Sequence, residues 1–183
     1  MSAKRNPSFT IALCALLAAL GAAVMTAGGW IPIATYCAPL LAGLLLLPVL
    51  YEFSRREAWM VWAVTAALSL MLSVDKEAGA MYFFLGWYPI VKPALDGVRP
   101  KVLGFLAKLL LFAAAFTAMY ALLLYVFQLE AVLEDMQTLG LAMNLAMDAL
   151  LVVVMLLYDF LLGRLWPLYV YRLRPRLGRT GQK

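Results

Sequence analysis

The sequence predicts an all-α integral membrane protein, a bundle of six transmembrane helices with both termini in the cytoplasm. The chain of 183 residues is 66% hydrophobic and only 14% charged, whereas soluble domains average about 25% charged residues. The apolar residues form runs close to the ~20 residues that a bilayer core requires. The basic residues stand at the ends of these runs, where they set membrane orientation. The net charge of +5 therefore does not indicate nucleic-acid binding.

We expect a single domain over residues 1–183, in which short polar turns separate the spans. The expected spans cover residues 9–27, 33–51, 58–74, 78–92, 102–127 and 139–162, and a basic tail covers 163–183. Gly28, Gly29 and Pro32 favour a break between the first two spans. A basic start before an apolar run also fits a signal peptide. The length of the run and the lack of a clear small-x-small cleavage site favour a retained span.

The fourth apolar run, residues 78–91, decides the topology because it is the shortest of the six. A run of 14 residues is more typical of a re-entrant or interfacial segment than of a span. If it crosses, thirteen of the fifteen Lys and Arg residues lie on the cytoplasmic side and only Lys76 lies outside. If it does not cross, four lie inside and ten outside. The positive-inside rule therefore favours six spans and a multi-pass protein of the plasma membrane.

The sequence indicates no enzyme, and it predicts no catalytic residue, cofactor or metal site. Histidine, the commonest general base and metal ligand, is absent. Cys14 and Cys37 each lie alone in an apolar run, where small packing residues are expected. No Ser or Cys stands beside a base, although a carboxylate mechanism using Asp148 stays open. No GxxxxGK[ST] loop occurs, so an energy source must come from another chain.

Three ionisable residues, Lys108, Asp148 and Asp159, lie inside the expected spans. Such residues are costly in a bilayer and are usually functional. Lys108 and Asp159 lie at similar depths on antiparallel helices, so we expect an intramembrane ion pair between them. The pair either serves only to lock the two helices together, which is the favoured interpretation, or takes part in function.

A candidate ligand site lies in the outer half of the bundle. At 100° per residue, Asn144, Asp148 and Asp159 fall within about 60° on one face of the last span. Tyr82 is expected near the level of Asp148, and Trp30 lies in the turn above. One interpretation is a site for a small cationic or zwitterionic solute. The alternative is an interhelical hydrogen bond worth about 1 kcal/mol, with the aromatic residues in an interfacial belt.

The first span carries Ala15, Ala19 and Ala23 at four-residue spacing. Small residues at this spacing allow another helix to approach closely. With this feature the chain resembles the S components of energy-coupling factor (ECF) transporters, small membrane subunits that capture vitamins. The likeness rests on the size, the short basic amino terminus, the segment ALCALLAALGAAV and the break GGWIP before APLLAGLLLLPVL. It covers residues 9–50 with some specificity and the rest by architecture alone.

The resemblance implies a substrate-binding subunit for micronutrient uptake, with a coupling subunit and ATPases supplied in trans. It implies that Ala15, Ala19 and Ala23 of the first span face the coupling subunit. It also implies an outer-half pocket, and the residues near that pocket would be Trp30, Glu77, Tyr82, Asn144 and Asp148. The alternative hypothesis is a non-catalytic scaffold or assembly protein of the bacterial cell envelope. An outward cavity would favour the binding subunit, because a ligand site requires a concave pocket.

Overall fold

The computed structural model describes residues 7–31, 34–125, 146, 149–165 and 167, and helices make up almost all of this part of the chain. The helices are α1 (Pro7–Gly28), α2 (Ala34–Leu44), α3 (Leu46–Glu52), α4 (Arg55–Leu72), α5 (Lys76–Leu85), α6 (Tyr88–Asp96) and α7 (Lys101–Tyr125). A further helix covers residues 149–165 and is called the 149–165 helix below. The described residues contain no strand, so the all-α prediction is confirmed for them.

Three helical stretches among the described residues are long and apolar enough to cross a membrane: Ser8–Gly28, Ala34–Glu52 and Lys101–Leu122. Their surfaces carry large apolar side chains, of which Ile11 is 69% and Leu110 is 70% exposed. Soluble monomers rarely expose large contiguous apolar patches. The length of these helices and their exposed apolar side chains are therefore those of a membrane protein.

Two proline residues explain why two of the expected spans are interrupted helices. α2 ends at Leu44 and α5 ends at Leu85, four residues before Pro48 and Pro89 respectively. Proline has no N–H to donate to the carbonyl four residues earlier, and its ring clashes with that carbonyl. The chain resumes as α3 and as α6. α6 continues to Asp96, beyond the expected end of the fourth span.

Capping residues determine where α4 and α5 begin. Ser54 Oγ accepts a hydrogen bond from the backbone N–H of Arg56 at 3.2 Å and donates one to the carboxylate of Glu57. This arrangement is similar to a capping box, and the Ser54 hydroxyl lowers the pKa of Glu57 below its usual value. Asp75 Oδ1 accepts from two backbone N–H groups in the first turn of α5, at 3.0 and 3.1 Å. Both charged turns are thereby held at helix ends.

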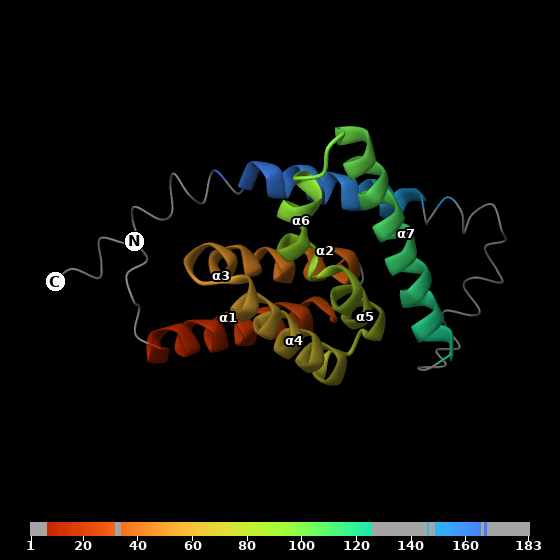
Figure 1. Cartoon of the computed structure of the whole chain (residues 1–183). Coiled ribbons are helices and arrows are strands. Elements are labelled where there is room, and N and C mark those ends of the chain that lie inside the picture. The colour runs from red at the N-terminus through yellow and green to blue at the C-terminus, as the bar shows by residue number, and fades with distance from the viewer. Residues whose placement is uncertain (1–6, 32–33, 126–145, 147–148, 166, 168–183) are drawn as a thin grey trace.

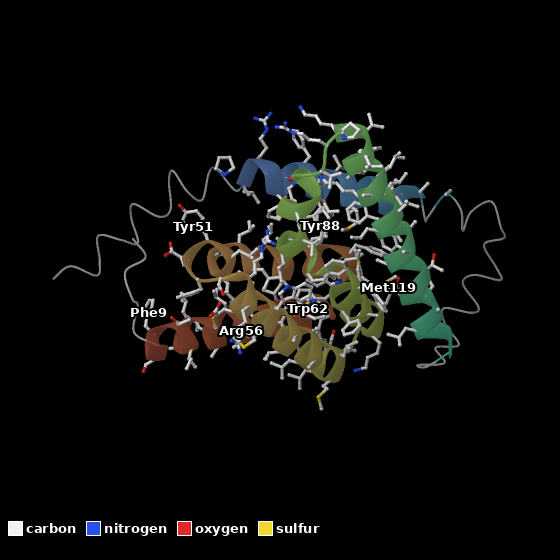
Figure 2. All side chains as sticks on the ribbon, in the orientation of Figure 1. Phe9, Tyr51, Arg56, Trp62, Tyr88 and Met119 are labelled. Carbon is white, nitrogen blue, oxygen red and sulfur yellow. The ribbon has the colours of Figure 1, made fainter. Side chains whose placement is uncertain are left out.

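The helices pack around α5, which contacts α2, α4 and α7. Figure 1 shows α1 beside the α2–α3 pair, with the 149–165 helix (blue) on the other side of that pair, close to α6. α1 and α4 approach closely at Gly21, where an added Cβ would lie 2.9 Å from Thr65 Cγ2. The Thr65 hydroxyl donates to the carbonyl of Ala18 at 3.4 Å. In Figure 2, Tyr88 lies inside the molecule, whereas Phe9 lies at its edge.

Candidate functional site

Four charged side chains meet where α6, α7 and the 149–165 helix come together. We call Lys92, Asp96, Lys108 and Asp159 the ionic cluster. Asp159 accepts hydrogen bonds from Lys92 and, at 2.9 Å, from Lys108. The carboxylate of Asp96 lies 2.5 Å from Lys108 Nζ and 3.2 Å from Lys92 Nζ. Two ammonium groups therefore balance two carboxylates.

Most of the ionic cluster is withdrawn from the surface. The side chains of Lys108 and Asp159 are 10% and 18% exposed, and that of Lys92 is 13% exposed, whereas Asp96 is 46% exposed. Tyr88 is fully buried and donates its hydroxyl to Asp159 Oδ1 at 2.5 Å. Buried charges are tolerated when they are paired and hydrogen-bonded. Asp159, with three donors, is the centre of the cluster.

The spacing along α6 explains how one short helix supplies much of this site. Tyr88, Lys92 and Asp96 follow one another at intervals of four residues, which places them on one face of a helix. The structure brings Lys108 and Asp159 together, as their expected depths indicated. Lys92 and Asp96 were not predicted as partners, although their four-residue spacing from Tyr88 is a signal that could have identified them.

A pocket of about 280 Å³ lies beside the ionic cluster. Its wall consists of residues from three helices. α3 supplies Leu47, α6 supplies Pro89, Lys92, Pro93 and Asp96, and the 149–165 helix supplies Leu162 and Gly163. Lys92 and Asp96 are the charged members, and the others are apolar. Small-molecule sites typically have volumes of ~300–1,000 Å³ and mostly apolar walls, so this pocket suits a small ligand or a head group. None of its residues belongs to the predicted outer-half site.

A second polar group lies where the turn after α1 meets the start of α5. The Thr35 hydroxyl donates to Asp75 Oδ2 at 2.6 Å, and the Tyr36 hydroxyl donates to Glu77 at 3.3 Å. The backbones are close here, because a Cβ added at Gly29 would lie 3.2 Å from the backbone N of Asp75. The first turn and the acidic turn before α5 therefore occupy the same end of the molecule.

The predicted ligand residues lie in different environments. Trp30 is 77% exposed in the first turn, and Glu77 is partly buried in the first turn of α5. Tyr82 is fully buried in a core cluster with residues of α1, α2 and α4, so in this structure it packs the core. Asn144 and Asp148 lie outside the described residues. The structure thus places Trp30 in the first turn and Glu77 in the first turn of α5, and it does not place Tyr82 at the surface.

The predicted docking residues share one exposed face of α1. Ala15, Ala19 and Ala23 are all exposed, whereas Ala18 and Ala22 are only 4% and 6% exposed. α1 packs against α2 and α4 with the buried face. The other face, which we call the alanine face, is not covered by the described part of the chain.

Comparisons with known proteins give no family assignment. No protein-family model, curated protein or solved structure matches the chain. The likeness to ECF S components therefore rests on the sequence features alone. Within the described residues, no group of three or more His, Cys, Asp and Glu side chains could hold a metal ion.

Proposed function

We propose that the chain is a six-span membrane protein with both termini in the cytoplasm. Neighbouring helices that pack in opposite directions support this topology. Trp59 near the start of α4 stacks on Trp87 just after α5, with ring centroids 6.0 Å apart. A Cβ added at Gly79, near the start of α5, would lie 3.4 Å from Leu70, near the end of α4. α5 thus runs back along α4, as the first part of a fourth span would.

Cysteine labelling tests this topology. The background is the double variant Cys14→Ala and Cys37→Ser, because Cys37 is exposed. We expect a cysteine at position 30 to react with an impermeant reagent added outside, and one at position 99 to react only after the cytoplasmic side is opened. Trp30 and Arg99 are both exposed. Labelling of position 99 from the outside would rule out six spans.

The activity that we propose is capture of a small cationic or zwitterionic solute in the outer half, followed by delivery through a separate energised complex. The alanine face of α1 is the observation that supports this proposal most. The exposed side of α1 also carries Ile11, Leu16 and Leu20, but the row Ala15, Ala19 and Ala23 between them consists of small residues. The exposed Leu106 on α7 and Leu157 on the 149–165 helix are large. Large apolar side chains suit contact with lipid, whereas small residues let a partner helix approach closely.

The solute site rests on two features of the first-turn end. Trp30 offers an exposed aromatic ring. Asp75 lies against Gly29 of the same turn, and Asp75 and Glu77 accept hydrogen bonds from Thr35 and Tyr36 at the start of α2. Carboxylates and an aromatic ring at one end of the molecule favour a cation, because both attract positive charge. Asp148, expected at the same end, would add a third carboxylate. An anionic solute is therefore disfavoured.

The partner half of this proposal predicts that Ala19→Trp abolishes association with a co-purifying membrane complex. The indole would project from the alanine face and keep a partner helix at a distance. Leu106→Trp, on an exposed face of α7, is the matched control and should leave association unchanged. The measurement is affinity purification from native membranes followed by quantitative mass spectrometry of the bound proteins.

The ligand half predicts that Asp148→Asn weakens a cationic ligand about tenfold, as expected for the loss of one charge-assisted contact, while Ala19→Trp leaves ligand retention intact. Small molecules retained by the purified protein are identified by mass spectrometry. If Ala19→Trp keeps every partner and Asp148→Asn keeps the ligand, a scaffold becomes the better assignment.

A further inference from the structure

We infer that the pocket beside the ionic cluster is a second ligand site, and that it binds a zwitterionic head group with a primary ammonium and an anion on a short linker. The site lies between α3, α6 and the 149–165 helix. It shares no residue with the outer-half solute site or with the alanine face. It therefore stands or falls independently of the proposed transport function.

The charges in the pocket wall favour a zwitterion. Lys92 Nζ and the carboxylate of Asp96 lie 3.2 Å apart on successive turns of α6, and both line the pocket. An ammonium group has three N–H donors, and the described partners of Lys92 are Asp96 and Asp159, so one donor can reach a ligand anion. Asp96, the most exposed charge of the cluster, can accept from a ligand ammonium.

Charge balance favours a zwitterion over a simple ion. The ionic cluster holds two positive and two negative groups that are mostly buried. A bound cation or anion would add an uncompensated charge to a region of low dielectric, which is costly. A zwitterion contributes both signs and leaves the sum at zero. Because Asp159 already holds Lys92 and Lys108, the pocket is also organised before the ligand arrives, which lowers the entropic cost of binding.

The rest of the wall favours a lipid as the source of the head group. Leu47, Pro89, Pro93 and Leu162 form an apolar surface around the two charges, against which the first carbons of an acyl chain would pack. A primary ammonium donates charge-assisted hydrogen bonds to a carboxylate, whereas a choline group has no N–H to donate. Phosphatidylethanolamine carries this head group, and soluble phosphoethanolamine carries the same chemistry without the chains.

Gly163 provides a direct test, because it lines the pocket and a Cβ added there meets no heavy atom within 4 Å. Leucine at this position adds a bulky side chain to the pocket wall and changes no member of the ionic cluster. The protein is purified in an equimolar mixture of phosphatidylethanolamine, phosphatidylcholine and phosphatidylglycerol, and native mass spectrometry measures the bound lipids. We expect the wild type to be enriched in phosphatidylethanolamine. We expect the Gly163→Leu variant to bind this lipid with an affinity at least about tenfold lower.

Leu157→Phe is the matched control, because Leu157 is 63% exposed on the same helix and does not line the pocket. It should bind lipids as the wild type does. Thermal unfolding shows whether Gly163→Leu still folds. Equal binding of the three lipids, or enrichment of phosphatidylethanolamine that survives Gly163→Leu in a folded protein, would overturn the assignment.

A charge variant tests the head-group chemistry separately from pocket volume. Asp96→Asn removes the acceptor for the ligand ammonium and leaves Lys92 in place. The preference should therefore shift from phosphatidylethanolamine towards phosphatidylglycerol, and an unchanged preference would contradict binding of a zwitterion.

Competition with soluble phosphoethanolamine distinguishes a lipid from a soluble molecule as the source of the head group. Displacement of the lipid supports recognition of the head group alone, and resistance to displacement supports recognition of the whole lipid.

Discussion

Replacing Asp159 by leucine is expected to destabilise the protein by about 3 kcal/mol, as is typical when one partner of a buried ion pair is removed. Asp159 accepts hydrogen bonds from Lys92, Lys108 and Tyr88. Without it, Lys92 and Lys108 share only the carboxylate of Asp96, and the cluster gains a net positive charge. The measurement is reversible unfolding in mixed micelles. Leucine retains the bulk of the side chain, so the loss reports mainly on charge.

A double-mutant cycle with Lys108→Met identifies the cause. Lys108→Met alone leaves an excess negative charge, but the double variant retains the neutral pair of Lys92 and Asp96 one turn apart on α6. The double variant should therefore be more stable than the sum of the single changes predicts, by about 1–3 kcal/mol. Lys101→Met, at an exposed position on α7, should have little effect. Strict additivity would show that Lys108 and Asp159 do not interact.

The contact between Lys108 and Asp159 could be predicted because an unpaired charge inside a bilayer is costly. Two opposite charges at the same depth on neighbouring antiparallel helices have few other partners. Lys92 and Asp96 were not predicted as partners, because Lys92 was placed at the end of the fourth span and Asp96 in the polar segment after it. In the structure, Lys92 and Asp96 have partners on other helices, so the helix continues past the first charge.

The ends of the helices were largely predictable, since glycine, proline and charged turns act locally. The first expected span, 9–27, matches α1 closely, and the third, 58–74, overlaps α4, which Ser54 caps at its start. The pocket was not predictable, because its volume depends on how Leu47, α6 and Gly163 fit together across three helices. The burial of Tyr82 is likewise a result of packing between helices.

Replacing Gly43 by alanine is expected to destabilise the protein by about 2 kcal/mol, a typical effect of overpacking a core. A Cβ at this position would lie 2.6 Å from the Tyr158 hydroxyl oxygen, which is closer than two non-bonded atoms can approach. Tyr158 is only 4% exposed, so its ring cannot easily move away. The free energy of unfolding in mixed micelles measures the effect.

Tyr158→Phe should restore the stability of Gly43→Ala, because the next ring atom, Cζ, would lie 3.7 Å from the new methyl group. The Tyr158 hydroxyl is buried without a hydrogen-bond partner among the described residues, so its removal sacrifices no observed interaction. A buried hydroxyl without a partner costs about 1–3 kcal/mol, and Tyr158→Phe alone should therefore be neutral or stabilising. Gly163→Ala, which introduces a methyl group with no neighbour within 4 Å, is the control for adding a Cβ to a helical glycine. If the double variant is as unstable as Gly43→Ala alone, the contact between α2 and the 149–165 helix is not the one described.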